Sequence, residues 1–394
     1  MKKLFIVSEL FYPNKTSTAY IMTELAKYFK GSYDVSVLTT DLAYDSNISE
    51  GENDLAFCIR RSKVSNVNKN SFVSRIKGAI SSSFLLTKAV MKHVKKGEKV
   101  LAVTNPFLII FFLAVLRKFK KFDYILLVHD VFPENTIPAG LKSKDSLSYK
   151  IIKSIFDWSY RQADKIIVLG GDMKQLLITK RVQKDKIAVI ANWYDSELVY
   201  RSDVNVNEYL GRFNFESKVI IGFAGNVGRV QGLDLFINSF KKANNINICF
   251  VVVGEGAQLN ELKKISEGYE NIIFLGSKPR EEQSIFLNIF DIGLVTLAKG
   301  MYGLGVPSKS YNLLHLGKPI LYIGDCDSEI DIMIKKHDCG WSFDWDNDNK
   351  LVDFLMSITP INTKYNYNRN STIAEEYYCK DKIMKQFEFV VNGK

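Results

Sequence analysis

The chain has 394 residues, of which 46% are hydrophobic and 24% are charged. This length predicts two to three domains, and the composition excludes a small disulfide-stapled peptide, a disordered chain, a collagen and a coiled coil. Lysine and arginine total 53 against 43 acidic residues, and the net charge of +10 favours a polyanionic partner: a nucleotide, a nucleic acid or an anionic membrane.

Neither the cysteines nor the apolar runs indicate secretion or a membrane span. The five cysteines are scattered and odd in number, so we expect reduced thiols in a cytoplasmic protein. The first apolar run meets Ser8 and Glu9 too early for a signal peptide and predicts a buried strand. The longest apolar stretch, Pro106–Leu116, is far shorter than the roughly 18 to 20 residues that cross a bilayer.

Short apolar runs alternate with helical patterns along the chain, which predicts parallel strands covered on both faces. The first series of runs is Leu4–Val7, Val35–Thr39, Val100–Val103, Tyr124–Val128 and Lys165–Leu169. The second series is Val219–Ala224, Ile248–Val253, Asn271–Leu275, Ile292–Leu297 and Pro319–Ile323. The sequence therefore predicts an α/β fold with two Rossmann-like, doubly wound domains.

The predicted domain boundaries follow from this restart of the pattern. We expect an N-terminal domain over residues 1–197 and a C-terminal domain over residues 198–371. The polar, weakly periodic segment Asn192–Phe215 is typical of a hinge between them. The amphipathic stretch Thr372–Val391 predicts one final helix, and we expect residues 372–394 to pack back on the N-terminal domain.

Ligands of open α/β sheets lie beyond the carboxyl ends of the strands, so the residues there are the functional candidates. Gly225, Asn226, Gly228, Arg229 and Gln231 follow the strand Val219–Ala224 and open a helix. Glycines let the backbone approach an anion, the helix start attracts phosphate, and an arginine adds a second contact. A plain tight turn is the alternative, and no Gly-Lys-Ser/Thr follows to make a Walker loop.

Two further turns and one helix start belong to the same predicted edge. Gly254 and Glu255 follow one strand, and Lys278 and Pro279 follow the next, as nucleoside contacts or as ordinary turns. Pro307 and Ser308 then begin a helix with Lys309 in its first turn. A cation is disfavoured at that helix end unless an anion lies between them, so Lys309 is either a phosphate ligand or a solvated lysine.

These motifs together resemble one enzyme family. GNVGRVQGLD, VVGEG, IFLGSKPREE, GVPSKSYNLLHLGKP and ANWYD are similar, over nearly the whole chain, to the retaining GT-B glycosyltransferases of family four. The Pro-Ser-Lys version resembles bacterial enzymes that build O-antigen and capsule repeats, including N-acetyl-fucosamine transferases. The resemblance implies that the two domains face a central cleft and that the second domain binds a nucleotide-sugar, expected to be UDP-linked, as donor.

The sequence departs from the family at two pairs of positions. Leu304 and Asn312 stand where the family usually has two glutamates, and the resemblance places Asn312 near the donor ribose. Asn226 and Gln231 replace an arginine and a lysine of the phosphate loop, and Arg229 and Lys309 are expected to supply that charge. The remaining donor contacts that the resemblance implies are Gly225, Gly228, Gly254, Glu255, Lys278, Pro279, Gly305, Val306, Pro307 and Ser308. A deoxy or N-acetyl amino sugar would suit the apolar Leu304.

The first domain supplies the acceptor candidates. His129, Asp130 and Glu134 follow the strand Tyr124–Val128, where they could orient an acceptor hydroxyl, stabilise charge on the sugar ring or relay a proton. Helix caps and turn bonds are the alternative role for them. Tyr12, Thr16, Ser17 and Thr18 follow the first strand and resemble the family's acceptor loop, without its glycines.

A basic stretch over residues 60–99 contains eleven lysines and arginines and a single acid, Glu98. Apolar residues run among these charges at helical spacing, and such a surface suits an anionic membrane. An ordinary core helix with solvated charges is the alternative.

These observations lead to one expectation and three alternatives. We expect a metal-independent, cofactor-free retaining transferase that moves a sugar to a lipid-linked saccharide for O-antigen or capsule synthesis, peripheral on the inner face of the cell membrane. His129, Asp130, Arg229 and Lys309 are its catalytic candidates. The alternatives are a nucleotide-sugar epimerase of the same fold, a degenerate saccharide- or nucleotide-binding protein, and a nucleic-acid protein, for which no motif accompanies the basic stretch.

Overall fold

The structure is a computed structural model of the chain, and it divides into two compact units. It describes residues 1–14, 16–41, 55, 57–64, 72–141, 143–211, 215, 217–360 and 367–393, without the side chains of 72–75 and 367. Residues 65–71 of the predicted basic stretch therefore lie outside the described residues. Unit 1 comprises Met1–Asn135, Lys142–Ile190 and Met384–Lys394, and unit 2 comprises Thr136–Leu141 and Ala191–Ile383.

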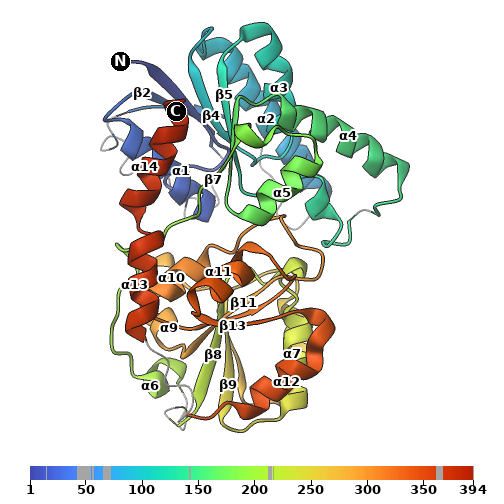
Figure 1. Cartoon of the computed structure of the whole chain (residues 1–394), viewed down its shortest axis with the longest axis vertical. Coiled ribbons are helices and arrows are strands. Elements are labelled where there is room, and N and C mark those ends of the chain that lie inside the picture. Colours follow the sequence, from blue (N-terminus) through green and yellow to red (C-terminus); the bar gives the residue numbers. More distant parts are fainter. Residues whose placement is uncertain are drawn as a thin grey trace. The chain divides into compact units, whose positions relative to one another are not determined.

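The described part of unit 1 forms a sheet of seven parallel strands in the order β3-β2-β1-β4-β5-β6-β7 (Figure 1). These strands are β1 (Lys3–Val7), β2 (Asp34–Thr40), β3 (Cys58–Ser62), β4 (Lys99–Val103), β5 (Asp123–Val128), β6 (Lys165–Val168) and β7 (Ile187–Val189). The connecting helices are α1 (Ser17–Phe29), α2 (Phe72–His93), α3 (Ile109–Lys120), α4 (Leu147–Arg161) and α5 (Gly171–Thr179).

The described part of unit 2 forms a sheet of six parallel strands in the order β10-β9-β8-β11-β12-β13. These strands are β8 (Val219–Ala224), β9 (Ile248–Val253), β10 (Ile272–Gly276), β11 (Ile292–Thr296), β12 (Ile320–Ile323) and β13 (Gly340–Phe343). Its helices are α6 (Val206–Leu210), α7 (Leu233–Ala243), α8 (Leu259–Ile265), α9 (Gln283–Asn288), α10 (Lys309–His315), α11 (Glu329–His337), α12 (Asp348–Ser357) and α13 (Tyr367–Tyr377).

In each sheet the strands run outward from the middle in two opposite series, and the point where one series gives way to the other locates the candidate site. In unit 1 the reversal lies between β1 and β4, and in unit 2 it lies between β8 and β11. Doubly wound sheets bind ligands at the carboxyl ends of the strands beside such a reversal. The prediction of two Rossmann-like, doubly wound sheets is confirmed.

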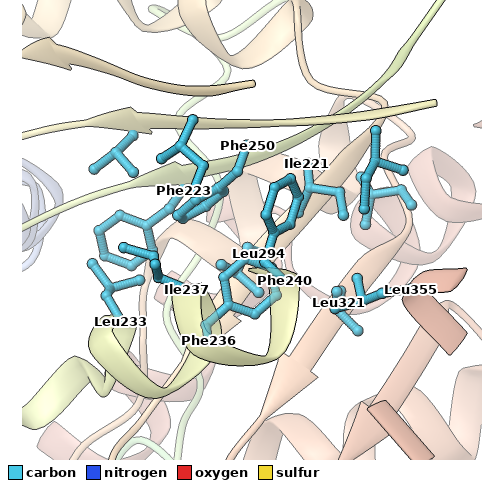
Figure 2. Packing of buried hydrophobic residues seen from close by; sticks show 14 of the residues in the cluster. Ile221, Phe223, Leu233, Phe236, Ile237, Phe240, Phe250, Leu294, Leu321 and Leu355 are labelled. Carbon is cyan, nitrogen blue, oxygen red and sulfur yellow. The ribbon is translucent and has the colours of Figure 1, made fainter. Parts of the chain in front are cut away.

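The core of unit 2 shows why its sheet and helix α7 form together. Phe236 and Phe240 lie one helical turn apart on α7 and point toward Phe250 of β9 (Figure 2). The Phe236 and Phe250 rings meet edge to face with centroids 4.8 Å apart. Helix α7 begins after Gly232, whose φ of +63° favours glycine.

Three edge strands were not predicted. β3, β7 and β13 are short, and their sequences CIRRS, IAV and GWSF lack the continuous apolar run of a strand buried on both faces. An edge strand has one neighbour and one open side, so its sequence is under weaker hydrophobic constraint.

The single final helix predicted over Thr372–Val391 is wrong, because the structure has two helices there. α13 ends at Tyr377 and α14 (Lys380–Val391) begins after a break. The carbonyl of Tyr378 accepts a hydrogen bond from the Tyr194 N–H (3.3 Å) instead of continuing a helix. The last turns of α14 belong to unit 1, where Glu388 accepts a bond from the Tyr28 hydroxyl (2.8 Å).

The first part of the predicted hinge is buried in unit 2. Asn192, Trp193, Tyr194 and Asp195 are each less than 9% exposed. Tyr194 stacks on His315 of α10 with ring centroids 4.0 Å apart, which ties the segment to the body of the unit. No helix of the described residues is long and apolar enough to cross a membrane.

Candidate functional site

The glycine-rich loop after β8 is braced by the turn after β9. The Gly225 N–H donates to the Val253 carbonyl (2.9 Å), and the Val227 N–H donates to the Glu255 carbonyl (2.8 Å). A β-carbon added at Gly254 would lie 1.8 Å from the Gly225 carbonyl oxygen. The predicted contact residues Gly254 and Glu255 therefore fix the loop through their backbone, and the Glu255 side chain is exposed.

The polar side chains of this loop divide between internal bonding and solvent. Gln231, in the short 3-10 helix η4 (Arg229–Gln231), accepts a hydrogen bond from the Gly228 N–H (3.1 Å) through Oε1. Asn226 and Arg229 are exposed. Arg229 makes no ion pair with any described residue. The loop thus places its backbone and the exposed Arg229 guanidinium beside the reversal of strand order between β8 and β11.

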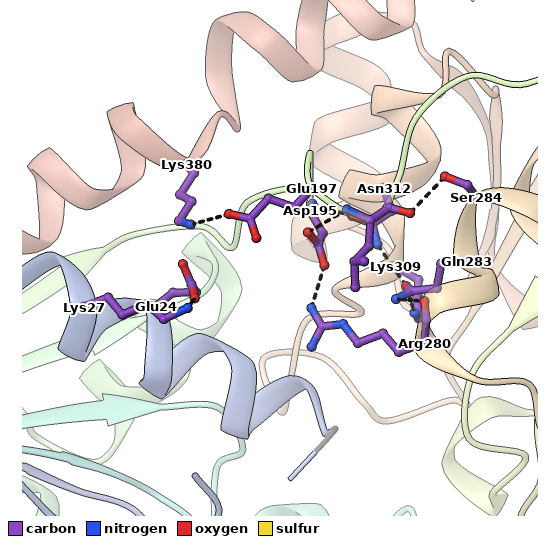
Figure 3. A network of polar contacts seen from close by, with 11 residues as sticks. Glu24, Lys27, Asp195, Glu197, Arg280, Gln283, Ser284, Lys309, Asn312 and Lys380 are labelled. Atoms are coloured by element: carbon purple, nitrogen blue, oxygen red, sulfur yellow. Dashed lines mark hydrogen bonds and ion pairs between the residues drawn. The ribbon is translucent and has the colours of Figure 1, made fainter. Parts of the chain in front are cut away.

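A polar network surrounds the start of α10 (Figure 3). The Lys309 ammonium donates to Oε1 of Gln283, which also accepts a bond from Asn312 Nδ2 (3.4 Å). Asn312 Oδ1 accepts a bond from the Asp195 N–H (2.9 Å), and Asp195 Oδ2 accepts one from the Arg280 guanidinium (2.7 Å). Residues from the segment after β7, from η5 (Arg280–Glu282), from α9 and from α10 are thereby held together.

Lys309 is a poorly compensated cation in this network. Burial lowers the pKa of Lys309 to about 8; the Arg280 charge also lowers it, and the Asp195 carboxylate opposes the shift. Among the described residues, its ammonium has one hydrogen-bond partner, the neutral Gln283 amide, and no ion-pair partner. An anion would bind more tightly here than at a solvated lysine, because the ammonium is already desolvated in the folded protein and binding does not have to remove its water.

The structure gives Asn312 and Leu304 internal roles. Asn312 is 7% exposed, and both ends of its amide are bonded within the protein. Leu304 is 3% exposed, and its N–H donates to the Met301 carbonyl (3.0 Å). The segment between these two residues is more open, because Gly305, Val306, Pro307 and Ser308 are each partly exposed.

Lys278 and Pro279 lie after β10. The Lys278 ammonium is 5.7 Å from the centroid of the Tyr209 ring, within the range of a cation–π contact. Pro279 is exposed and precedes η5. Both residues follow the strand as predicted, and no hydrogen bond of their side chains joins them to the network around Lys309.

Asp325 contacts the loop that precedes Leu304. Its carboxylate accepts bonds from the Gly300 N–H (3.1 Å) and the Tyr302 N–H (2.7 Å), which orders the loop that leads to Leu304. Among the described residues no group of three or more His, Cys, Asp or Glu side chains could hold a metal ion.

In unit 1, His129 and Thr18 come together at the sheet edge. Thr18 Oγ1 and His129 Nδ1 are 3.4 Å apart, and the His129 N–H donates to Thr104 Oγ1 (3.1 Å). Burial lowers the pKa of His129 to about 4, so the ring is neutral near pH 7. Its Nε2 atom is buried without a hydrogen-bond partner among the described residues, and the neighbouring Asp130 is exposed.

Glu134, predicted to contact an acceptor, belongs to a buried ionic network. Its Oε1 atom accepts from Lys180 (2.5 Å) and from Lys153 (3.2 Å), and Lys180 also pairs with Asp157 (2.6 Å). The Lys180 side chain is 0% exposed, and burial lowers its pKa against the opposing effect of both carboxylates. Glu134 Oε2 has no described partner, so one oxygen remains for a further contact.

The predicted acceptor loop caps helix α1. Thr16 is the N-cap residue, and its side chain accepts from the Ala19 N–H (3.3 Å). The Tyr12 N–H donates to Thr23 Oγ1 (3.2 Å), and Arg61 donates to the Tyr12 carbonyl. Ser17 is exposed. Tyr12 and Thr16 are therefore both fixed, and the exposed Ser17 and the partly exposed Thr18 lie in the first turn of α1.

Two family models match the two halves of the chain. The model described as Glycosyltransferase Family 4 matches residues 19–198, and the model described as Glycosyl transferases group 1 matches residues 208–367. The chain is also 33% identical over 354 residues to WbjE of Pseudomonas aeruginosa, described as a probable glycosyltransferase, which covers 87% of this chain and 86% of WbjE. The chain therefore belongs to the same glycosyltransferase family as WbjE.

Two other comparisons agree with this glycosyltransferase assignment. WcaI of Escherichia coli strain K12, provisionally named as a colanic acid biosynthesis glycosyl transferase, is 21% identical over 64% of this chain and 63% of its own. HepE of Anabaena, solved with UDP, has a TM-score of 0.71 at 12% identity and covers 100% of both chains. At that identity the likeness shows the fold alone, which is GT-B.

Three residues of the polar network around Lys309 were not predicted from the sequence: Asp195, Arg280 and Gln283. Asp195 and Arg280 stand inside the motifs ANWYD and IFLGSKPREE, which contributed to the resemblance. No local pattern predicts the contact between these two motifs, because 85 positions separate Arg280 from Asp195. Gln283 carries no charge and lies outside any recognisable spacing.

Proposed function

We propose that this glycosyltransferase is a retaining enzyme that moves a sugar from a UDP-linked donor to a lipid-linked saccharide, in O-antigen or capsular polysaccharide synthesis. The observation that carries the proposal is Lys309 on the segment that follows β11, whose partly buried ammonium has only a neutral amide partner among the described residues. A diphosphate would supply the missing charge. The solved complex of HepE with UDP-glucose, a protein of the same fold, and the name of WcaI support a nucleotide-sugar donor and a polysaccharide product.

The chemistry follows from charge on the leaving group. As the bond between sugar and diphosphate breaks, negative charge grows on the diphosphate, and Lys309 with the backbone of the loop Gly225–Gly228 would stabilise it. In a front-face reaction the acceptor oxygen bonds to the anomeric carbon on the same face from which the diphosphate leaves, so the anomeric configuration is retained. The departing phosphate takes the acceptor proton, and no protein nucleophile is needed. His129 and Asp130 would orient the acceptor hydroxyl, and His129 does so as a neutral ring.

Helix α2 supports the membrane part of the proposal. It contains no acidic residue along its 22 positions. Its exposed apolar side chains are Ile76, Ile80, Phe84 and Met91, and its exposed lysines are Lys77, Lys88 and Lys92. A helix with these two features binds an anionic bilayer in the plane of the interface. The enzyme would thus work peripherally on the inner face of the cell membrane, where lipid-linked acceptors are within reach.

Helix α4 presents a second apolar row in the same unit. Leu147, Ile151 and Ile155 are 73%, 53% and 40% exposed, at spacings of four residues. Lys150 is exposed beside this row. α4 and α2 both pack on α3, and we infer that the row on α4 would add to the contact proposed for α2.

A nucleotide panel followed by a turnover assay tests the proposal. We expect UDP to raise the melting temperature more than GDP, CMP or dTDP, and Lys309→Ala to abolish the shift. UDP release from a UDP-sugar should then require a lipid-linked acceptor, and the product should keep the anomeric configuration by NMR. No shift with any nucleotide would overturn the donor assignment, and an inverted product would overturn the retaining mechanism. Sugar isomerisation without acceptor would instead identify an epimerase.

A further inference from the structure

A groove in unit 1 runs along the edge strand β7 beside helix α14. It has a volume of about 470 Å³ and is lined by residues 185–190, by Lys165 at the start of β6, and by Lys385, Gln386, Phe389 and Val390 of α14. All of these residues belong to unit 1, and none was predicted to contact the donor or the acceptor. We call this feature the β7–α14 groove.

Strand β7 pairs with β6 on one side, and its other side is open. The Ile190 N–H donates to the Val168 carbonyl of β6 (2.9 Å), so the backbone groups of Ile190 point toward β6. Backbone groups of neighbouring strand residues point to opposite sides, so those of Ile187 and Val189 point away from β6. The Ile187 carbonyl accepts a bond from the Lys174 ammonium (2.9 Å). Within the described part of the chain, the N–H and the carbonyl of Val189 have no hydrogen-bond partner.

The β7–α14 groove follows this open side of β7 and not one face of the sheet. Side chains of neighbouring strand residues point to opposite faces, so a hollow on one face would be lined by every second residue. Four consecutive residues, 187–190, line this groove. Its apolar surface includes Val189 and Phe389, which are 39% and 58% exposed. The groove therefore places a free pair of backbone groups next to exposed apolar side chains.

The charged side chains of the groove are mostly positive. Lys165, Lys186 and Lys385 line it together with one acid, Asp185. None of these four side chains forms an ion pair with a described residue, and the Lys186 ammonium donates to a neutral group, the Ala163 carbonyl (3.3 Å). Three lysines against one aspartate leave a surplus of two positive charges. This surplus favours an occupant that carries carboxylates.

A second copy of this chain and a membrane fit the groove less well. Pairing β7 with β7 of a second copy would bring the same lysines together, and like charges on neighbouring strands disfavour pairing. The membrane contact proposed above uses α2 and α4, which pack on α3. α1 and α3 connect strands on opposite sides of the reversal of strand order, so right-handed crossovers place them on opposite faces of the sheet. α14 lies beside α1, where the Tyr28 hydroxyl donates to Glu388 (2.8 Å; Figure 1), so α14 and the groove lie away from that contact.

We propose that the β7–α14 groove binds an extended, acidic peptide segment of a partner protein, which adds to β7 as a further strand. The N–H and the carbonyl of Val189 bond to the peptide backbone, which is how an exposed sheet edge takes up a peptide. Phe389 contacts the apolar side chains of the peptide, and the lysines of the groove pair with its carboxylates. This site goes beyond the proposed function, because it recruits a partner through a surface that contains no donor or acceptor residue.

A labelled peptide of alternating glutamate and valine tests this site by fluorescence anisotropy with the full chain. We expect it to bind about tenfold more tightly at low salt than a peptide of alternating lysine and valine, because the groove attracts the first and repels the second. A strand bonds to its neighbour through every second N–H. Methylation of every second backbone nitrogen of the peptide should therefore abolish binding in one of the two possible registers and preserve it in the other.

Two variants remove different parts of the site. Val189→Pro deletes the outward N–H and leaves the bonds to β6 in place, so it should weaken binding by about fivefold, whereas Val189→Thr keeps that N–H and should bind as the wild type does. Lys385→Glu reverses one charge on α14 and should weaken binding by about tenfold. Its control is Lys2→Glu, since Lys2 is an exposed lysine of unit 1 that does not line the groove. An unchanged melting temperature in each variant excludes unfolding as the cause.

Four other outcomes would overturn the proposal. Equal affinity for the acidic and the basic peptide, or equal affinity for both methylated peptides and their parent, would exclude an added acidic strand. A dimer of the free protein that Val189→Pro dissociates would assign the groove to a second copy. Loss of binding to anionic vesicles in Lys385→Glu would assign it to a membrane. No binding of the acidic peptide would leave the lysines with the single role of preventing contacts between sheet edges.

Discussion

Gly254 and Gly225 approach each other so closely that a β-carbon on Gly254 would lie 1.8 Å from the Gly225 carbonyl oxygen. The φ of Gly254 is +146°, which side chains rarely adopt. The contact joins the turn after β9 to the glycine-rich loop after β8, and the Gly225 N–H bond to Val253 (2.9 Å) runs beside it. Gly254 thus sets the position of the loop proposed to face the donor.

We expect Gly254→Ala to lower the free energy of unfolding by about 3 kcal/mol, through backbone strain and displacement of the loop. The control is Gly268→Ala, since Gly268 also has a positive φ (+83°) but no atom within 4 Å of an added β-carbon. That change should cost about 1 kcal/mol. Urea denaturation of both variants compares them, and equal losses would mean that the contact with Gly225 is unimportant.

The low pKa of Lys309 predicts a pH dependence of diphosphate binding. In the free protein burial lowers this pKa to about 8, with Arg280 adding to the shift and Asp195 opposing it. Below pH 8 the ammonium is charged and its contribution is constant. Above pH 8 the free protein loses this proton, so affinity for UDP should fall by up to tenfold per pH unit.

Titration calorimetry checks this expectation through proton uptake. At pH 8.5, binding heats measured in two buffers of different ionisation enthalpy should reveal uptake of a fraction of one proton. Lys309→Arg is the control, because a guanidinium stays charged over this range. The same decline in affinity with pH in that variant would assign the effect to another group.

The interior of the fold was predictable from the sequence, and its edges were not. β5 (Asp123–Val128) and β9 (Ile248–Val253) are continuous apolar runs, since both faces of a parallel strand are covered. β3 (Cys58–Ser62) carries two arginines and has no such pattern. The break between α13 and α14 lies where the Tyr378 carbonyl accepts a hydrogen bond from the Tyr194 N–H, a contact between distant segments that no local pattern encodes.

A site residue was predictable where a single local motif contains the side chain and the reason for its role. Lys309 was selected because a cation stands in the first turn of a helix, and the structure finds it poorly compensated. Asn312 was expected to reach the ribose, and the structure bonds its amide to Asp195 and Gln283. Asp195 lies 117 positions and Gln283 lies 29 positions before Asn312, so these pairings follow from packing of the whole unit and not from local spacing.

The buried ionic network of unit 1 predicts a large stability loss. Lys180→Met leaves the carboxylates of Glu134 and Asp157 without their fully buried partner. We expect a loss of about 3 to 5 kcal/mol in the free energy of unfolding by urea denaturation. Lys153→Met is the control, because the Lys153 side chain is 35% exposed and its loss should cost about 1 kcal/mol or less. Equal losses would indicate that burial of Lys180 carries no special weight.

The exposed face of α2 predicts binding to anionic vesicles. Phe84 and Ile80 are 60% and 45% exposed, one helical turn apart. Replacing either with serine should reduce the partition coefficient by about tenfold, because each apolar side chain contributes about 1.5 kcal/mol when buried in the interface. Sedimentation with vesicles of phosphatidylglycerol and phosphatidylethanolamine measures this change.

The matched control for the vesicle experiment is Ile246→Ser in unit 2. Ile246 is 76% exposed, more than either residue of α2, so a general effect of surface hydrophobicity would be at least as large there. A membrane contact confined to α2 leaves this variant with wild-type partitioning. Binding should also weaken with added salt and with neutral phosphatidylcholine vesicles, since Lys77, Lys88 and Lys92 act through charge. Equal losses in all three serine variants, or binding insensitive to lipid charge, would exclude the proposed face.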